Sequence, residues 1–351
     1  MRFSIFQDSS IGGRQVNQDR MGYCFTRDSL VMVVADGLGG HFRGEIAAEI
    51  VIRSLAVQFQ TLAKMQLRDP AFFLTAALTT AHREILAEAL EKQYIETPRT
   101  TVACAVVQEG KLWTAHAGDS RVYLFREGVL IHRTRDHSKV QSLITLGLIT
   151  QDEALFHPDR NKVLNCLGTD LEPLVELSAP IDLHPGDLVV LCTDGFWASL
   201  ADNRIWQAMT SGALQDKLPG LIQEAVVGGG RNPDNSTAVV MLWEQPDPKT
   251  VESDISSDWL PDGALTTTIN LSVADAQAIE AAPAMTDEEM QRTIDEIRDA
   301  IAQSEEKLLD LGAVAMIDNK VTAQKPLPQK PLTQNPLPQI PVLNSAKKSI
   351  E

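Results

Sequence analysis

Four aspartates stand in turn-like positions of this chain, each among small or polar neighbours: Asp36, Asp119, Asp194 and Asp234. Each adjoins a short apolar run with the character of a buried strand, in the same order: Leu30–Ala35, Leu112–Ala117, Leu188–Cys192 and Thr237–Trp243. A single Asp-Gly turn is weak evidence for function, because Asp and Gly are both common turn residues. Four carboxylates at the ends of strands predict a compact, oxygen-rich site of the kind that Mg²⁺ or Mn²⁺ requires.

The segments that would position these aspartates are mostly strands. Strand-like runs are predicted near 2–7, 21–26, 30–35, 100–108, 112–117, 120–126, 187–193 and 237–243. Two longer segments, about 43–66 and 70–94, carry apolar residues at helical spacing. Asp69-Pro70 has the form of an N-cap followed by proline at the first helical position. Many strands follow each other through short turns, which predicts antiparallel sheets with helices on the outside.

The C-terminal part of the chain has a different character. Residues 246–285 are polar and weakly patterned, and a linker is predicted there. A helix is predicted over 286–312, because Thr286 and Glu289 form a capping box. Residues 313–351 repeat Gln and Pro, which indicates a flexible, extended tail. The predicted helix carries one apolar stripe, which leaves open docking on the rest of the chain, binding to another protein and self-association: Met290, Ile294, Ile297, Ile301, Leu308 and Leu311.

Composition narrows the class of protein. The chain has 351 residues, of which 44% are hydrophobic, and this is enough for a sizeable core. Its net charge of −16 argues against nucleic acid or an anionic membrane as the main partner. Neither a signal peptide nor a membrane span is expected, so the expected location is the cytoplasm. The cysteines show no CxxC spacing and are expected to be free, buried thiols: Cys24, Cys104, Cys166 and Cys192.

Eight stretches match one protein family, in order: GGRQVNQDRMG (12–22), VVADGLGGHFRGEIAAE (33–49), RTTVACAVV (99–107), LWTAHAGDSRVYLFREG (112–128), TRDHSKVQSLITLGLIT (134–150), HPDRNKVLNCLG (157–168), GDLVVLCTDGFW (186–197) and DNSTAVVM (234–241). On these motifs, residues 1–245 resemble the metal-dependent protein phosphatases of the 2C type, in their bacterial serine/threonine branch. The resemblance implies an α+β fold, a four-layer α-β-β-α sandwich of two antiparallel sheets flanked by helices. It implies hydrolysis of phosphoserine and phosphothreonine in proteins, opposing a bacterial Ser/Thr kinase.

The resemblance also implies how the acidic residues hold metal. Asp36 would bridge two Mn²⁺ or Mg²⁺ ions, and the carbonyl of Gly37 would complete the shell of one. Asp194 and Asp234 would hold the other ion. Asp119 resembles the ligand of a third, weaker ion. Two such ions activate a shared water for attack on a phosphoester.

Other residues would act around the metals. Arg14 would grip the substrate phosphate, which suits the parallel donors of a guanidinium group. Asp19 would orient water at the metals. Gln18 and Asn235 would lie around the ligands. Many relatives carry glutamate at the position of Gln18, so the dinuclear site is expected to lose some metal affinity.

The general acid is left open. Eukaryotic members carry a histidine two residues after the bridging aspartate, where this chain has Leu38, and His41 should not inherit that role. His116 and His137 are interpreted as core or turn residues rather than ligands. Residues 138–165 match the mobile flap of the family, which borders the site and affects substrate choice.

Two other hypotheses compete with this one. In the first, the chain is a pseudophosphatase that uses the fold only for binding. The neutral Gln18 is the residue that supports this hypothesis. In the second, the chain remains an enzyme but its function lies in the C-terminal extension, which acts as an adaptor that recruits partners through the predicted helix.

Overall fold

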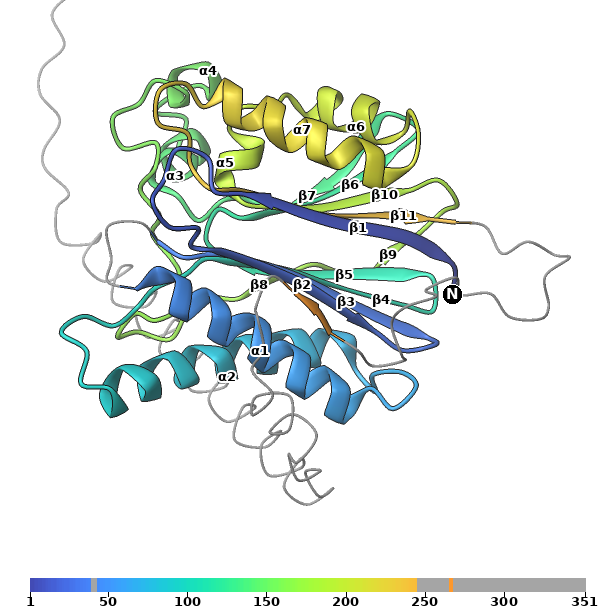
Figure 1. Cartoon of the computed structure of the whole chain (residues 1–351), viewed down its shortest axis with the longest axis horizontal. Helices are drawn as coiled ribbons and strands as arrows, with labels where there is room; N and C mark the ends of the chain where they lie inside the picture. Colours follow the sequence, from blue (N-terminus) through green and yellow to red (C-terminus); the bar gives the residue numbers. More distant parts are fainter. Residues whose placement is uncertain (39–42, 245–264, 268–351) are drawn as a thin grey trace, which may run out of the picture. The chain divides into compact units, whose positions relative to one another are not determined.

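The computed structural model describes residues 1–38, 43–244 and 265–267. Two antiparallel sheets pack face to face, and helices cover the outer face of each sheet (Figure 1). This is the α-β-β-α sandwich that the sequence predicted, so the fold class is confirmed.

The first sheet has five strands in the order β1-β11-β10-β6-β7. In this sheet, β11 pairs with β1 on one side and with β10 on the other. Strands from the beginning and the end of the folded region therefore lie next to each other. The loop after β1 therefore meets the loop before β11, which brings Arg14 close to Asp234. The strands are β1 Phe3–Ser10, β6 Arg121–Arg126, β7 Val129–Arg133, β10 Leu188–Cys192 and β11 Ser236–Trp243.

The second sheet follows the order β12-β2-β3-β4-β5-β8, and β9 pairs with β5 as well. The short strands β8 and β9 were not predicted, and β2 begins at Asp19 rather than near residue 21. The strands are β2 Asp19–Phe25, β3 Ser29–Asp36, β4 Val102–Gln108, β5 Lys111–Ala117, β8 Glu176–Leu177, β9 Ile181–Asp182 and β12 Leu265–Thr267.

Each central strand contributes to two cores, because successive side chains of a strand point to opposite faces. In β3, Met32 and Val34 pack between the two sheets, whereas Val31 and Val33 pack under the outer helices. Both faces of the strand are therefore buried. This explains why the run 30–35 is continuously apolar rather than alternating.

Two pairs of helices flank the sheets (Figure 1). The predicted long helices are α1 Gly44–Leu62 and α2 Pro70–Glu91, which cover the second sheet. Asp69 caps α2 as predicted, because its side chain accepts a hydrogen bond from the backbone N–H of Phe72 at 3.0 Å. The other helices are α3 Lys139–Thr145, α4 Gln151–Ala154, α5 Asp194–Trp197, α6 Asp202–Met209 and α7 Leu214–Gly228. The last two pack on the first sheet.

The predicted C-terminal segments lie mostly outside the described residues. Within the predicted linker, β12 pairs with the edge of β2. The predicted helix over 286–312 and the tail over 313–351 are not among the described residues. In the described part of the chain, no helix combines the length and the apolar character that crossing a membrane requires.

Candidate metal centre

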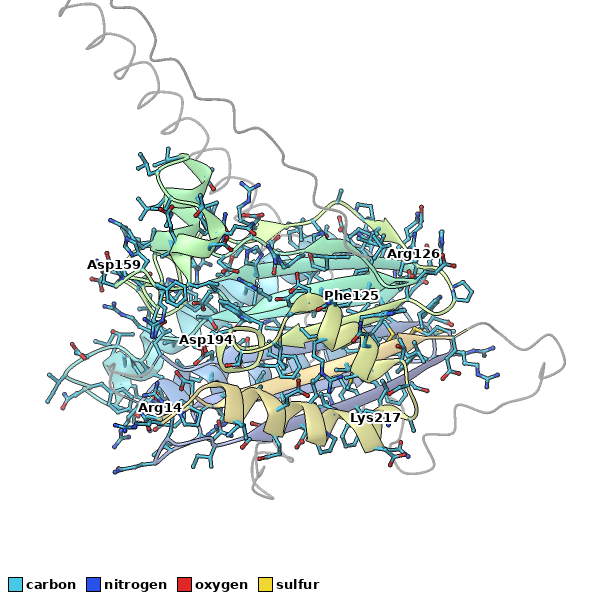
Figure 2. The ribbon with its side chains drawn as sticks, turned by 90° about the horizontal axis from the view of Figure 1, so that it is seen from above. Arg14, Phe125, Arg126, Asp159, Asp194 and Lys217 are labelled. Atoms are coloured by element: carbon cyan, nitrogen blue, oxygen red, sulfur yellow. The ribbon has the colours of Figure 1, made fainter. Side chains whose placement is uncertain are left out.

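A polar cavity of about 380 Å³ contains the predicted site residues. Figure 2 shows Arg14 and Asp194 toward one end of the sandwich, together with Asp159, whereas Arg126 and Lys217 lie toward the other end. Asp19 does not line the cavity, but it is buried close enough to Asp36, Asp194 and Asp234 for their charges to interact. The predicted residues that line the cavity are Arg14, Gln18, Asp36, Gly37, Asp119, Asp194, Asp234 and Asn235.

The ends of several strands bring the aspartates together. Asp36 is the last residue of β3, and Asp194 is the first residue of α5, just after β10. Asp119 lies in the turn between β5 and β6, and Asp234 lies just before β11. These strands belong to different sheets, so the cavity is formed where one end of the first sheet meets one end of the second.

Asp19 is the most enclosed carboxylate of the group, with 1% of its surface exposed. One of its oxygens, Oδ2, accepts a hydrogen bond from the hydroxyl of Thr193 at 2.8 Å. Its other oxygen, Oδ1, is buried without a hydrogen-bond partner among the described residues, and the same is true of Oδ1 of Asp194. Buried polar atoms usually have a partner, so these two orphaned oxygens require an explanation.

The carboxyl groups perturb one another. Burial, together with repulsion from neighbouring aspartates, raises the pKa of Asp19 to about 7 and the pKa of Asp194 to about 6. Burial also raises the pKa values of Asp36 and Asp119 well above their usual range, with repulsion from Asp194 adding to the effect. Removal of carboxylates from water without a compensating positive charge has this effect. A bound cation would supply that charge.

The donor set fits hard divalent cations. The cavity offers several carboxylate oxygens and the backbone of Gly37, and oxygen is the ligand that Mg²⁺ and Mn²⁺ prefer. The orphaned oxygens of Asp19 and Asp194 point to the same conclusion, because a metal or its water would satisfy them.

Arg14 lies at the rim of the cavity. Its Nη2 contacts Oδ2 of Asp234 at 2.7 Å, and both side chains are partly exposed, 41% and 39%. Asn235 holds the surrounding loop: its Oδ1 accepts from the backbone N–H of Gln18, and its Nδ2 donates to the carbonyl of Ile11. These bonds join the loop before β11 to the loop between β1 and β2.

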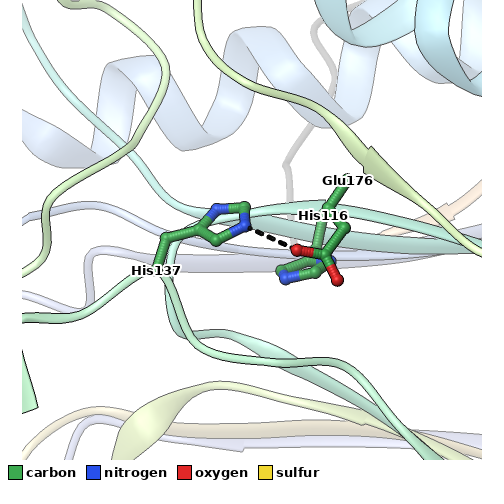
Figure 3. A group of neighbouring side chains, drawn as sticks. All are labelled: His116, His137 and Glu176. Carbon is green, nitrogen blue, oxygen red and sulfur yellow. Dashed lines mark hydrogen bonds and ion pairs between the residues drawn. The ribbon is translucent and has the colours of Figure 1, made fainter. Parts of the chain in front are cut away.

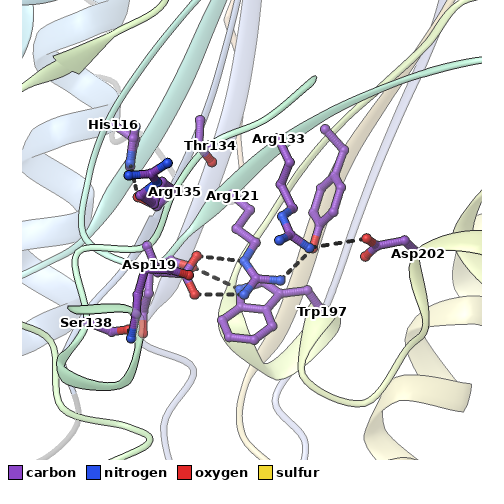
Figure 4. A network of polar contacts seen from close by, with 12 residues as sticks. His116, Asp119, Arg121, Arg133, Thr134, Arg135, Ser138, Trp197 and Asp202 are labelled. Atoms are coloured by element: carbon purple, nitrogen blue, oxygen red, sulfur yellow. Dashed lines mark hydrogen bonds and ion pairs between the residues drawn. The ribbon is translucent and has the colours of Figure 1, made fainter. Parts of the chain in front are cut away.

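A network that the sequence analysis missed supports Asp119 (Figure 4). The indole N–H of Trp197 donates to the backbone carbonyl of Asp119 at 2.9 Å. The guanidinium of Arg121 lies over the Trp197 ring, 3.4 Å from its centroid, and donates twice to Asp136 at 2.7 Å. Asp136 lies two residues before the flap, so this network joins the Asp119 turn to the segment that leads into the flap. Arg121 and Asp136 are 15 residues apart, and no sequence signal paired them.

Part of the flap borders the cavity. Asn161 and Val163 line it, whereas the exposed Arg160 and Lys162 do not. Leu38 also lines the cavity, so the position where eukaryotic members carry histidine holds no titratable group here. His41 lies outside the described residues.

A second group of metal-type ligands lies beside the flap (Figure 3). One ligand atom each of His116, His137 and Glu176 lie within 4.8 Å of one another. The Nδ1 of His137 accepts hydrogen bonds from the amide of Asn165 at 2.7 Å and from the N–H of Gly118 at 3.3 Å. Its Nε2 therefore carries the proton and donates to Glu176 at 3.2 Å. These bonds use the nitrogen lone pair that a metal would need, and they support the interpretation of His137 as a structural residue.

Comparison with known proteins gives matches to phosphatases. The chain is 34% identical to the serine/threonine protein phosphatase PstP of Mycobacterium tuberculosis over 215 residues, 60% of this chain and 40% of PstP. It is 29% identical to the serine/threonine phosphatase stp of Listeria monocytogenes over 231 residues, 65% of this chain and 90% of that protein. The solved catalytic domain of PstP in complex with two manganese ions is similar with a TM-score of 0.58 and 31% identity. This match covers 69% of this chain and 99% of that domain.

The match to PstP is partial, because the chain spans 40% of the length of that relative. Residues 6–216 match the protein phosphatase 2C family. That match covers more than half of the chain and includes the aspartates up to Asp194. The chain belongs to the protein phosphatase 2C family.

Proposed function

We propose that this chain removes phosphate from phosphoserine and phosphothreonine in proteins, with Mn²⁺ or Mg²⁺ bound in the cavity. The observation that carries the proposal is the buried carboxylate cluster, in which Asp19 and Asp194 each keep an oxygen without a partner among the described residues. Arg14 lies beside this cluster at the rim. The similarity to the serine/threonine phosphatases PstP and stp, and the manganese bound by PstP, support the same function.

Each residue of the cavity has a part in this proposal. Asp36, the Gly37 carbonyl, Asp194 and Asp234 would hold two ions, and Asp119 would hold a third together with Asp194. When bound, these ions would supply an activated water and neutralise charge on the phosphoryl oxygens.

The remaining roles belong to side chains that do not hold metal. Arg14 would bind the phosphate through two parallel N–H groups, and its exposed position leaves it accessible to a protein substrate. Asp19 is locked by the hydroxyl of Thr193, so its second oxygen has a fixed direction in which to accept a hydrogen bond.

We propose that the biological partners are phosphorylated proteins, namely a Ser/Thr kinase and the substrates of that kinase. The open rim and the flap residues Asn161 and Val163 suit a protein segment rather than a fully enclosed metabolite. We also propose a cytoplasmic location, which the buried thiols of Cys104, Cys166 and Cys192 favour, because a reducing compartment keeps thiols from forming disulfides.

The test is metal-dependent turnover by the full chain. Hydrolysis of p-nitrophenyl phosphate and of a phosphothreonine peptide should require Mn²⁺ or Mg²⁺ and should stop on addition of EDTA. Release of phosphate from a phosphorylated Ser/Thr kinase of the same genome would support the proposed partner. Metal binding without turnover of either small substrate would favour the pseudophosphatase hypothesis and contradict the proposed activity.

A further inference from the structure

The cavity contains one acidic residue that the sequence motifs did not assign. Glu45 lies in the first turn of α1 and lines the cavity together with Asp36 and Gly37. The side-chain amide of Gln18 donates a hydrogen bond to Oε2 of Glu45 at 3.1 Å. The neutral amide that departs from the family pattern is therefore in direct contact with a carboxylate.

Backbone packing fixes Glu45 beside the proposed metal ligands. The N–H of Gly37 donates to the carbonyl of Gln18 at 3.2 Å. A Cβ added to Gly44 would lie 2.6 Å from the carbonyl carbon of Gly37, and a Cβ added to Gly37 would collide with the backbone of Gly44. Side chains are excluded from both positions, so the start of α1 touches the metal-binding turn directly. Glu45 is the next residue along the chain.

The identity of residue 18 determines where the negative charge lies. A glutamine can donate to Glu45, whereas a glutamate at position 18 would repel it. The pair formed by Gln18 and Glu45 therefore carries one negative charge, located on Glu45. A carboxylate near metal ligands that does not bind the metal itself still affects metal affinity, by accepting hydrogen bonds from the ligands and from water.

We propose that Glu45 is a positioning residue of the metal centre: its carboxylate supplies, on the Gly37 side of the cavity, the charge that Gln18 lacks, and Gln18 holds it in place. This inference rests on the proposed metal-dependent function. It replaces the expectation that Gln18 simply weakens the site.

The test is Mn²⁺ binding measured by isothermal titration calorimetry on the full-length chain. Glu45→Gln should raise the Kd for Mn²⁺ by about tenfold or more, the size of effect found for residues around metal ligands. The double variant Gln18→Glu with Glu45→Gln moves the carboxylate to the other partner and keeps the amide–carboxylate pair. It should recover most of the lost affinity.

Glu49→Gln is the matched control, because Glu49 lies one turn further along α1 and does not line the cavity. It should leave the Kd unchanged. Melting curves in EDTA verify that each variant is folded. If Glu45→Gln does not fold, Glu45→Asp serves instead, since it keeps the charge but withdraws it from Gln18, and it should also raise the Kd.

Each outcome separates the hypotheses. A wild-type chain that binds no Mn²⁺ overturns the proposed function itself. A wild-type chain that binds Mn²⁺ as tightly as its folded Glu45 variant overturns the role of Glu45 and leaves the proposed function standing. A double variant no better than Glu45→Gln shows that the charge cannot be exchanged between the two positions, and the pairing with Gln18 is then wrong.

Discussion

Asp19 and Asp36 are register partners on the neighbouring antiparallel strands β2 and β3, so their carboxylates come from directly opposed positions of one sheet. Like charges at such positions destabilise a sheet. Here the repulsion adds to burial in raising the pKa of Asp36. The pair is therefore an unfavourable arrangement in the metal-free chain, and it becomes favourable when a cation is bound between or beside the two groups.

Stability of the metal-free chain should fall as the pH rises from about 4 to about 7. The pKa of Asp19 is about 7 and that of Asp194 about 6 in the folded chain, above the value of about 4 in the unfolded chain. The folded state thus holds protons that the unfolded state has already released, so deprotonation costs stability. Melting temperatures in EDTA between pH 5 and pH 8 measure this.

Two controls accompany the pH experiment. Excess Mn²⁺ should remove the decline, and Asp19→Asn should flatten it. His116 acts in the opposite direction, because burial lowers its pKa and its protonation below about pH 6.5 destabilises the folded state. A melting temperature that rises steadily in EDTA over this range would mean that the aspartates do not dominate.

Asp36→Asn should abolish turnover while stabilising the metal-free fold. A neutral amide cannot bridge two cations, so activity on p-nitrophenyl phosphate at saturating Mn²⁺ should fall below about a tenth of wild type. The same change removes the repulsion with Asp19, so the melting temperature in EDTA should rise. Retention of most of the activity would show that Asp36 is not the bridging ligand.

Arg14→Ala should raise KM for a phosphopeptide more than it lowers kcat, because a phosphate grip acts on substrate and transition state alike. The ion pair with Asp234 is partly exposed, so its loss should cost no more than about 1 kcal/mol of stability. Arg14→Lys is the matched variant, since it keeps the charge and loses the fork of donors. An unchanged KM in both variants would exclude Arg14 from the substrate site.

Trp197→Phe should weaken metal binding at Asp119. The substitution keeps a ring against Arg121 but removes the N–H that donates to the Asp119 carbonyl, a loss of about 1 kcal/mol. The Mn²⁺ concentration for half-maximal activity should rise, with kcat at saturation close to wild type. Trp206→Phe, on α6, is the control and should leave the Mn²⁺ dependence unchanged. Equal responses of the two variants would argue that the bond to Asp119 has no special role.

Shortening the chain tests the predicted domain boundary. A chain that ends after Thr267 keeps β12 on the edge of β2, whereas one that ends after Glu244 exposes that edge. Both should keep activity, because every cavity residue precedes residue 244. The shorter chain should self-associate more, since an open strand edge is a template for pairing, and size-exclusion chromatography measures this. An inactive or insoluble chain ending after Thr267 would place residues beyond it in the folded domain.

Local pattern in the sequence predicted much of this protein. The apolar runs beside Asp36 and Asp194 are strands, the cap at Asp69 is formed, and the predicted long helices are present. These features depend on side-chain alternation and on bonds between residues close in the chain, so the sequence contains the information directly. The motifs also singled out a set of acidic residues, and the structure places Asp36, Asp119, Asp194 and Asp234 around one cavity.

Only the tertiary structure decided which residues support that set. β2 begins at Asp19, earlier than predicted, and its register against β3 places Asp19 opposite Asp36. Register depends on the pairing of whole strands, so local pattern does not determine it. The contacts between Gln18 and Glu45, and between Trp197 and Asp119, join segments that are 27 and 78 residues apart. Sequence pattern cannot specify such contacts, because they follow from the close packing of sheets, turns and helices and not from the propensity of any one segment.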